Sequence, residues 1–456
     1  MDRMAAARML HLREERMNAR PAWQKPRGHY GFKLCCENGI GDCSMVSLLP
    51  ALILFLVLGA ILFRSRIPLS LRLAPWQAMA AGAAIVLLLG QISPGDAFAS
   101  IDWGTMAFLY ATFVLSGILQ ESGYLAHLGY KFMHHFYQPF LVVVSFSFCA
   151  GFASAFMLND TVAIIGVPLC ISMAKKSGVP VAPLLVALAL GVTIGGIPSP
   201  IGSPHNYIIA TRGNIASPFF EFAKYLLVPT VLSLVALACI LWVMFPDLRR
   251  LRRFTSDYWK RERDYGAART GFMTVIFLSF LRLAAGFVPG IPDFPLYLIP
   301  VAGAAVAVFM SGNPRKAFAT EWETLGFFAA MFILMAAVWQ SGFFQQFLPP
   351  ASSLSEPPVV VFSSLILSQV LSNVPFVIIY LNAFSGSMPI VSLMWLVAGS
   401  TLAGGLTIIG AASNIIIMQA AEKSGEKFPM KEFTIAGIAS VAVSLALIWA
   451  WMSIIA

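Results

Sequence analysis

Twelve apolar segments alternate with short polar stretches along this chain of 456 residues. They cover residues 46–63, 74–92, 104–120, 139–173, 182–210, 225–245, 271–288, 295–311, 324–348, 357–384, 392–419 and 432–454. Apolar stretches of about 18 or more residues need a bilayer rather than a protein core. Because lipid offers the backbone no hydrogen bonds, such segments must be helical. The pattern therefore predicts an all-α polytopic membrane protein with about 10 to 11 transmembrane helices.

Polar residues interrupt several of these segments. In 182–210 the break is "GGIPSPIGSPHN" (195–206), whose three prolines remove helix donors and clash with the preceding turn. Irregular backbone at membrane depth is tolerated only where it lines a cavity enclosed by protein. The segments 139–173 and 357–384 are long enough to enter the membrane and turn back, at "LNDT" and at "LSNVP". We therefore predict unwound helices and two re-entrant hairpins.

The two halves of the chain resemble each other. "DWGTMAFLYATFVLSGILQESG" (102–123) aligns without gaps to "EWETLGFFAAMFILMAAVWQSG" (321–342). "GVTIGGIPSPIGSPHNYII" (191–209) aligns to "GSTLAGGLTIIGAASNIII" (399–417), so the unwound helix also occurs twice. Interrupted helices in corresponding positions of two halves are typical of transporters, whose binding site lies where the repeats meet.

Lysines and arginines give the predicted orientation. The chain is 58% hydrophobic and 11% charged, with a net charge of +9, but its basic residues lie between apolar segments. They are therefore interpreted as topology signals, and no nucleic-acid partner is expected. The linker 247–270 holds eight of them and is predicted to be cytoplasmic, which makes 45–246 and 271–456 inverted repeats with both termini periplasmic. Residues 1–44 hold eight further lysines and arginines, although this orientation would place them on the periplasmic side. We therefore interpret this tail as a non-native extension before Met45.

Several of these motifs together resemble the ion transporter superfamily. They are "NDTVAIIGVPL" (159–169), "PIGSPHN" (200–206), "SNVP" (372–375) and "AGSTLAGGLTIIGAASNIII" (398–417), and the resemblance covers about residues 100–454. That group holds arsenite efflux permeases, one kind of sodium/proton antiporter, citrate transporters and divalent anion/sodium symporters. The resemblance implies hairpin tips that meet the unwound segments to form the site. It also implies a scaffold that dimerises and a transport domain that moves as an elevator.

The hairpin tips are the first candidate site. The dicarboxylate symporters carry Ser-Asn-Thr at both tips, and Asn159, Thr161, Ser372 and Asn373 match that motif here. The resemblance implies a sodium ion near these four residues. The remaining tip residue, Asp160, makes the first tip more similar to the arsenite and sodium/proton branches.

Asp160 is the only carboxylate well inside a predicted membrane segment. Because a charge is costly there, such a residue is interpreted as functional. A buried carboxyl can carry a proton, and a nearby sodium ion favours its ionised form. The alternative role, capping a helix over 161–173, is compatible with both. Arg282, the other deep charge, could attract an anion, balance Asp160, snorkel outward or pair within the scaffold.

The unwound segments supply the remaining candidates. Asn206 and Asn414 are related by the repeat, and their amides could bind an oxyanion, offer a carbonyl to a cation or hold freed backbone. His205 could titrate near neutral pH or be a hydrogen-bonded structural residue. Glycine lets backbone approach a ligand closely. The other candidates from the two segments are Gly196, Gly202, Thr401, Gly404 and Gly410.

Together these patterns predict an ion-coupled secondary transporter for a small anion or oxyanion, of the carboxylate or arsenite class. We expect sodium or proton coupling, no cofactor, and a lipid-embedded homodimer in the inner (cytoplasmic) membrane. A sodium/proton antiporter is the alternative. A membrane enzyme or a structural membrane protein is disfavoured, because the sequence has no metal-ligand spacing, no nucleophile with a base and no Walker-type motif.

Overall fold

The computed structural model describes ten parts of the chain. They are residues 48–62, 73–133, 135, 138–177, 180–250, 264–288, 294–318, 320–347, 351–384 and 388–455. These residues form helices and turns and contain no strand, which confirms the predicted all-α class. The tail 1–44 and the central part of the linker, 251–263, lie outside the described residues.

The chain divides into two compact units, and both draw on the two sequence halves. The first comprises Met1–Trp103 and Glu323–Phe347. Its helices are α2 (Leu49–Leu62), α3 (Pro75–Leu88), α4 (Pro94–Ser100), α15 (Trp322–Gln340) and the 3₁₀ turn η7 (Phe344–Gln346). Prolines at the first position of α3 and α4 favour a helix start, because the missing N–H would have no partner there.

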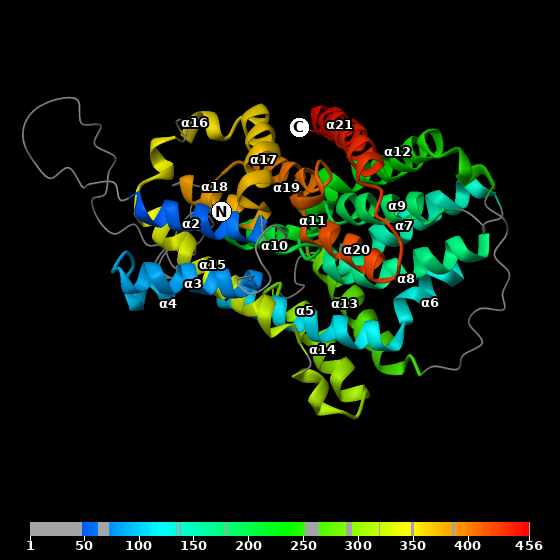
Figure 1. Ribbon diagram of the computed structural model, residues 1–456, viewed down its shortest axis with the longest axis horizontal. Coiled ribbons are helices and arrows are strands. Elements are labelled where there is room, and N and C mark those ends of the chain that lie inside the picture. The colour runs from blue at the N-terminus through cyan, green and yellow to red at the C-terminus, as the bar shows by residue number, and fades with distance from the viewer. Residues whose placement is uncertain are drawn as a thin grey trace, which may run out of the picture. The chain divides into compact units, whose positions relative to one another are not determined.

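The second unit comprises Gly104–Trp322 and Leu348–Ala456. Its first part contains α5 (Trp103–Ser122), α6 (Tyr124–Met133), α7 (Pro139–Phe156), α8 (Asn159–Ser177), α9 (Val181–Gly195), α10 (Pro204–Arg212), α11 (Pro218–Phe222), η3 (Ala223–Leu227), α12 (Val228–Met244) and η4 (Pro246–Arg250). Its second part contains α13 (Gly266–Ala284), α14 (Leu298–Met310), η6 (Pro314–Ala317), α16 (Ala351–Leu354), α17 (Pro357–Leu371), α18 (Asn373–Ala383), α19 (Ile390–Ala403), η8 (Ile408–Gly410), α20 (Ala412–Lys423) and α21 (Met430–Ile455). Figure 1 shows these elements in place.

Helices are interrupted where the sequence predicts it. The first break lies between α9 and α10, and Ser203 caps the new helix by accepting a hydrogen bond from the backbone N–H of Asn206. The second lies between α19 and α20. The α7–α8 hairpin turns at Met157 and Leu158, and the α17–α18 hairpin turns at Ser372. Re-entry from one membrane face and the inverted orientation of the two halves stay predictions.

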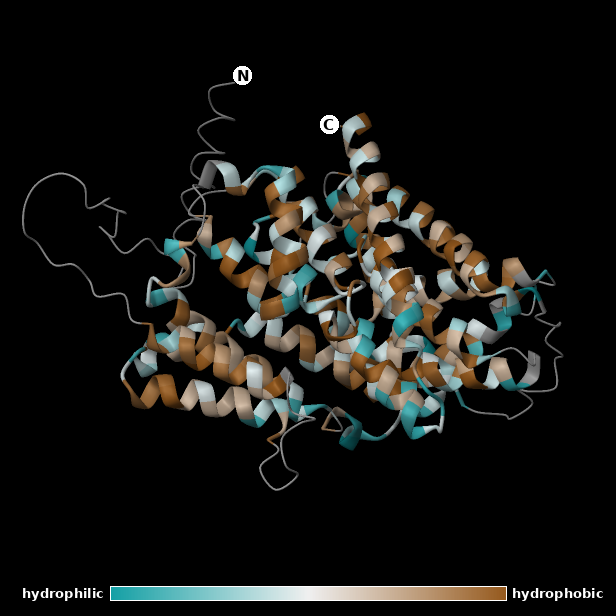
Figure 2. Cartoon of the chain, turned by 45° about the horizontal axis from the view of Figure 1, so that its top comes forward, coloured by the Kyte–Doolittle hydropathy of each residue, from teal (hydrophilic) through white to brown (hydrophobic). Residues whose placement is uncertain are grey.

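Five described stretches are long and apolar enough to cross a membrane: Trp103–Ser122, Pro218–Met244, Gly266–Ala284, Pro314–Gln340 and Met430–Ile455. Eight further apolar helices have 10–17 residues, and they include three hairpin helices, α7, α17 and α18, and the two helices before the breaks, α9 and α19. Figure 2 shows that hydrophobic residues predominate along the helices. These five helices are short because each hairpin turn or break divides one apolar segment of the sequence into two helices.

Candidate functional site

Each hairpin contacts the opposite half of the chain. Helix α8, from the first hairpin, packs against α20, which follows the second break. Helix α18, from the second hairpin, packs against α10, which follows the first break (Figure 1). These crossed contacts bring elements of both halves together within the second unit.

Asn206 holds the backbone of the first break. Its amide Nδ2 donates hydrogen bonds of 3.0 Å to the carbonyl of Gly196 and 3.0 Å to that of Ser199. The side chain is fully buried. Since carbonyls released from a helix need new partners in a buried site, Asn206 stabilises the unwound conformation.

Asn414 makes the same arrangement in the second break. Its Nδ2 donates to the carbonyl of Gly404 at 2.6 Å and to that of Thr407 at 3.5 Å. In both breaks the accepting residues lie ten and seven positions before the asparagine. The NH₂ groups of both asparagines therefore hold backbone freed by the breaks, which is one of the three roles considered for them. Their amide oxygens remain for other partners.

The two breaks are joined through Thr401, which lies on α19. Its hydroxyl donates to Oδ1 of Asn206 at 3.2 Å, and Nε2 of His205 lies 3.0 Å from the same hydroxyl oxygen. Because the threonine hydroxyl has a single hydrogen, His205 donates from Nε2 to Thr401. Nε2 also lies 3.2 Å from Oγ of Ser203. His205 is therefore a buried, hydrogen-bonded link between the halves.

At the first tip, two predicted residues have partners in the protein. Oδ1 of Asn159 accepts a hydrogen bond from the hydroxyl of Ser154, which also lies 2.8 Å from the carbonyl of Val192 on α9. The hydroxyl of Thr161 lies 2.6 Å from Oγ of Ser116 on α5. Since Ser116 donates to a carbonyl of its own helix, Thr161 is the donor in that pair.

Asp160 lies in the first turn of α8 and is partly buried. A carboxylate in this position is stabilised by the helix N-terminus. Glu321, just before α15, contributes a second negative charge that acts on Asp160. The first tip therefore places a carboxylate at a favourable helix end.

The second tip differs from the first. Ser372 has φ of 71°, a left-handed conformation that costs a non-glycine residue energy and clusters at functional sites. In the described residues, Oδ1 of buried Asn373 has no hydrogen-bond partner, and neither does Oδ1 of Asn414. The hydroxyls of Ser368 and Ser413 are also without one. Buried polar atoms nearly always have partners, so these four oxygens are candidates for contact with a ligand or with water.

Glycines allow the hairpins to approach the breaks. A Cβ on Gly196 would lie 2.8 Å from Oδ1 of Asn159, and one on Gly202 would lie 2.7 Å from the carbonyl of Gly196. In the second half, a Cβ on Gly410 would lie 2.8 Å from the carbonyl of Ala403, and one on Gly404 would lie 2.9 Å from the Cβ of Ala411. The structure thus places all four predicted glycines at close contacts.

Sequence reasoning missed Ser154, Ser368 and Gln369. Gln369 donates to the carbonyl of Ala403 at 2.7 Å and accepts from the hydroxyl of Thr407 at 2.6 Å, which binds α17 to the second break. A signal for the serines was present, because each lies five residues before its tip asparagine. Gln369 has no polar counterpart in the first half, so the repeat does not reveal it.

Arg282 belongs to α13, which is neither a hairpin helix nor a broken helix. It is buried on α13, and its guanidinium carbon lies 5.5 Å from the ring centroid of Phe294. Cation–π contact with an aromatic face stabilises such a charge. Among the roles predicted for Arg282, this contact fits pairing within the scaffold.

Comparison with known proteins identifies the family and several relatives of this chain. A family model described as "Citrate transporter" matches residues 53–398. An uncharacterized transporter of Mycobacterium tuberculosis is 26% identical over 398 residues, which cover 81% of this chain and 92% of that protein. The silicon efflux transporter LSI3 of Oryza sativa subsp. japonica is 24% identical over 412 residues, covering 75% and 84% of the two chains.

A solved structure has the same fold. The crystal structure of the YdaH transporter of Alcanivorax borkumensis, whose topology is described as unusual, matches with a TM-score of 0.50 at 14% sequence identity. The match covers 89% of this chain and 96% of that one.

Proposed function

Since this chain belongs to the citrate transporter family and is a membrane transporter rather than an enzyme, we propose that it moves a small anion or oxyanion by ion-coupled secondary transport. The cargo we propose is of the carboxylate or arsenite class. The coupling ion is sodium or a proton, and an elevator movement carries the site across the bilayer.

The observation that carries this proposal is that polar oxygens have protein partners at the first hairpin tip but lack them at the second tip and break. At the second tip and break, the four oxygens of Ser368, Asn373, Ser413 and Asn414 are buried without a partner in the described residues. Hydroxyl and amide oxygens suit a hard cation such as sodium, and broken helices in transporters commonly place backbone and side-chain oxygens around one. At the first tip, the oxygens of Asn159 and Thr161 already have protein partners. The coupling cation is therefore placed at the second tip in this proposal.

An anionic cargo fits the helix ends at the site. Helices α8, α10, α18 and α20 each begin at a tip or just after a break. The N-terminus of a helix carries a partial positive charge and free N–H groups, which favour anions. The family description and the silicon efflux relative favour a small, oxygen-rich cargo for this chain.

The second candidate is a sodium/proton antiporter. Asp160 favours it, because this partly buried carboxylate lies at the first tip, in the first turn of α8. Carboxylates inside membrane segments are typical of proton relays in transporters. In this alternative no anion crosses the membrane.

The finer organisation is also proposed. The halves 45–246 and 271–456 are inverted repeats, which the equal hydrogen-bond spacings of Asn206 and Asn414 support. Residues 247–270 are the cytoplasmic linker, and 1–44 is an extension outside the repeats. The protein is a homodimer in the lipid of the inner (cytoplasmic) membrane, as a multi-pass helical transporter.

Counterflow in proteoliposomes tests the proposal. Vesicles loaded with unlabelled citrate, succinate or arsenite are diluted into the labelled compound, with and without an inward sodium gradient or a pH gradient. We expect one of these anions to accumulate, and one gradient to increase its accumulation. A sodium-driven change of internal pH with no anion present would instead establish the antiporter. Failure of both assays with folded protein would contradict ion-coupled transport of these ligand classes.

A further inference from the structure

An apolar cavity of about 590 Å³ lies along the flank of the first hairpin. Helices α6, α7 and α8 form most of its wall, and Leu188 of α9 and Phe272 of α13 complete it. Among its 18 lining residues, only Lys131 and His135 are basic or strongly polar. The volume lies within the range of about 300–1,000 Å³ that is typical of ligand pockets.

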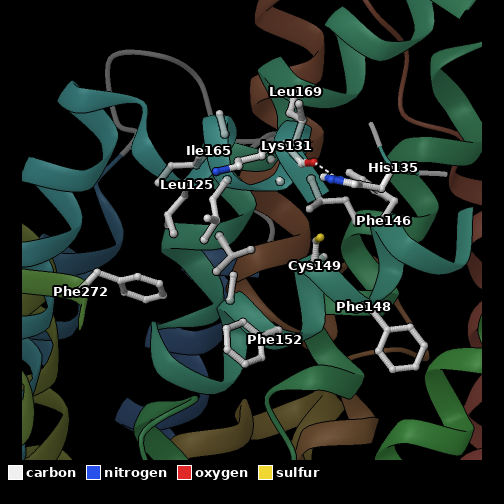
Figure 3. A pocket seen from close by; sticks show the side chains of 18 residues that line it. Leu125, Lys131, His135, Phe146, Phe148, Cys149, Phe152, Ile165, Leu169 and Phe272 are labelled. Atoms are coloured by element: carbon white, nitrogen blue, oxygen red, sulfur yellow. Dashed lines mark hydrogen bonds between the residues drawn. The ribbon is translucent and has the colours of Figure 1, made fainter. Parts of the chain in front are cut away.

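The basic residues lie at one end of this cavity. Figure 3 shows Lys131 and His135 at the end of the cavity near Leu169, with the nitrogen of Lys131 toward Ile165 and the imidazole of His135 on the other side, whereas Phe148 and Phe152 lie at the opposite end. Nδ1 of His135 donates a hydrogen bond of 2.8 Å to the backbone carbonyl of Lys131, which holds the imidazole beside it. The cavity is therefore amphipathic along its length.

The basic end and the apolar wall of the cavity determine which kind of ligand fits it. The cargo proposed above has charged or polar groups on all sides, and these would lose water without gaining partners among the phenylalanines. A ligand with a hydrocarbon chain and one anionic head satisfies both ends. Such a molecule has its chain between α7 and α8 and its head beside Lys131.

We propose that this cavity binds one acyl chain of an anionic phospholipid, with the headgroup phosphate at Lys131 and His135. Lys131 lies in the last turn of α6, between the apolar segments 104–120 and 139–173. The charge pattern predicts that this stretch is cytoplasmic, and the cytoplasmic leaflet is the one enriched in anionic lipid. Basic pockets between transmembrane helices on this side bind lipid headgroups. The inference concerns a site distinct from the hairpin tips and does not depend on the proposed cargo.

The bound chain would stabilise the first hairpin. Ala153 lines the cavity just before the tip, and Val162 and Ile165 line it just after Asp160. An acyl chain between them fills space that these side chains would otherwise leave empty, and it restrains α7 against α8. The lipid therefore acts on the helices that carry Asn159 and Asp160 without touching those residues.

Thermal unfolding of the delipidated full-length protein in detergent tests the site. The additions are dioleoylphosphatidylglycerol, dioleoylphosphatidylcholine or glycerol 3-phosphate. Three variants are compared. Lys131→Ala removes the basic residue of the cavity, and Ala126→Phe fills the cavity. Lys175→Ala is the control, because Lys175 is exposed near the end of α8 and does not line the cavity. We expect only phosphatidylglycerol to raise Tm at low concentration. Lys131→Ala should weaken its apparent affinity about fivefold, Ala126→Phe should abolish the effect, and Lys175→Ala should change nothing.

Alkylation gives a second measurement on the unmodified sequence. Cys149 lines the cavity, whereas Cys239 is exposed on α12 and lies outside it. Phosphatidylglycerol should slow the reaction of Cys149 with N-ethylmaleimide and leave that of Cys239 unchanged. Equal protection by phosphatidylcholine, protection by glycerol 3-phosphate alone, or no protection at all would overturn the proposal, and the last result would indicate an empty gap between helices.

Discussion

The hydroxyl of Thr401 donates a hydrogen bond of 3.2 Å to Oδ1 of Asn206, although 195 residues separate them in the chain. Both side chains are buried, and Asn206 in turn holds the unwound backbone of the first break. The packing of α19 against α10 therefore includes a direct polar link from one half of the chain to the broken helix of the other.

Replacing Thr401 with valine should destabilise the fold. The change keeps the shape of the side chain but leaves Oδ1 of Asn206 and Nε2 of His205 without this partner in a buried place. Such a loss costs about 1–3 kcal/mol. Thermal unfolding in detergent should show a lower Tm for Thr401→Val and a nearly normal one for Thr401→Ser. Equal Tm values for Thr401→Val and the parent would contradict the structural role of this bond.

Replacing glycines in the two helix breaks with alanine should destabilise the protein. A Cβ on Gly202 or Gly410 would come within 2.8 Å of a backbone carbonyl, so the backbone must move. Overpacking of this kind costs about 1–3 kcal/mol. Gly326 on α15 is the control, because a Cβ there meets nothing within 4 Å. Expression and Tm should fall for Gly202→Ala and Gly410→Ala but not for Gly326→Ala; a uniform response would contradict the close approach.

Much of the fold could be predicted from the sequence, because hydrophobic runs and prolines are local signals. The segment 182–210 with its prolines corresponds to α9, a break and α10, although the break is shorter at both ends than 195–206. The end positions differ because Gly195 still continues α9 and Pro204 already begins α10, where a proline is compatible with a helix start.

The partners within the site could not be predicted from the sequence. Thr401 was a candidate through its motif, but its bond to Asn206 depends on the crossed packing of the two halves, which leaves no periodic signal. Gln369 reaches the second break from α17, whose other polar residues are serines. The repeat related Asn206 to Asn414 correctly. It did not indicate that the amide oxygen of Asn206 has a partner, whereas that of Asn414 has none among the described residues.

The predicted orientation can be tested at two described positions. Asn214 is exposed in the loop after α10, which the charge pattern places outside. Asn313 is exposed before Arg315 and Lys316, in a loop placed inside. A membrane-impermeant maleimide added to intact cells should label a cysteine at Asn214 and should label one at Asn313 only after the cells are opened. The reverse pattern would invert the map, and labelling of both would contradict it.

Asn159 and Asn373 should both be required for transport, but for different steps. Asn159→Ala removes one of the two acceptors of the Ser154 hydroxyl, whereas Asn373→Ala removes an oxygen that has no partner among the described residues and is assigned to the coupling cation. Uptake should fall at least tenfold in both variants. Only Asn373→Ala should raise the cation concentration needed for half-maximal uptake.

Two comparisons make this result interpretable. The exposed Asn214→Ala variant should behave like the parent. Near-normal uptake by both tip variants at normal expression would mean that the site lies elsewhere, and an equal change of cation dependence in both would remove the proposed difference between the tips.

Asp160→Asn should separate coupling from exchange. The carboxylate lies in the first turn of α8, where asparagine has a similar shape and can still interact with the helix N-terminus, so the variant should fold. Its counterpart in the second half is the apolar Val374, so the repeat architecture does not require a charge there. If Asp160 carries or balances the coupling ion, accumulation driven by a sodium or proton gradient should be lost while equilibrium exchange of the cargo continues. Both rates are measured in the same proteoliposomes, with Glu321→Gln as a comparison for the second carboxylate that acts on Asp160. A variant that keeps full gradient-driven accumulation would remove Asp160 from the coupling mechanism and leave it as a helix cap, whereas loss of exchange as well would place the carboxylate in cargo binding.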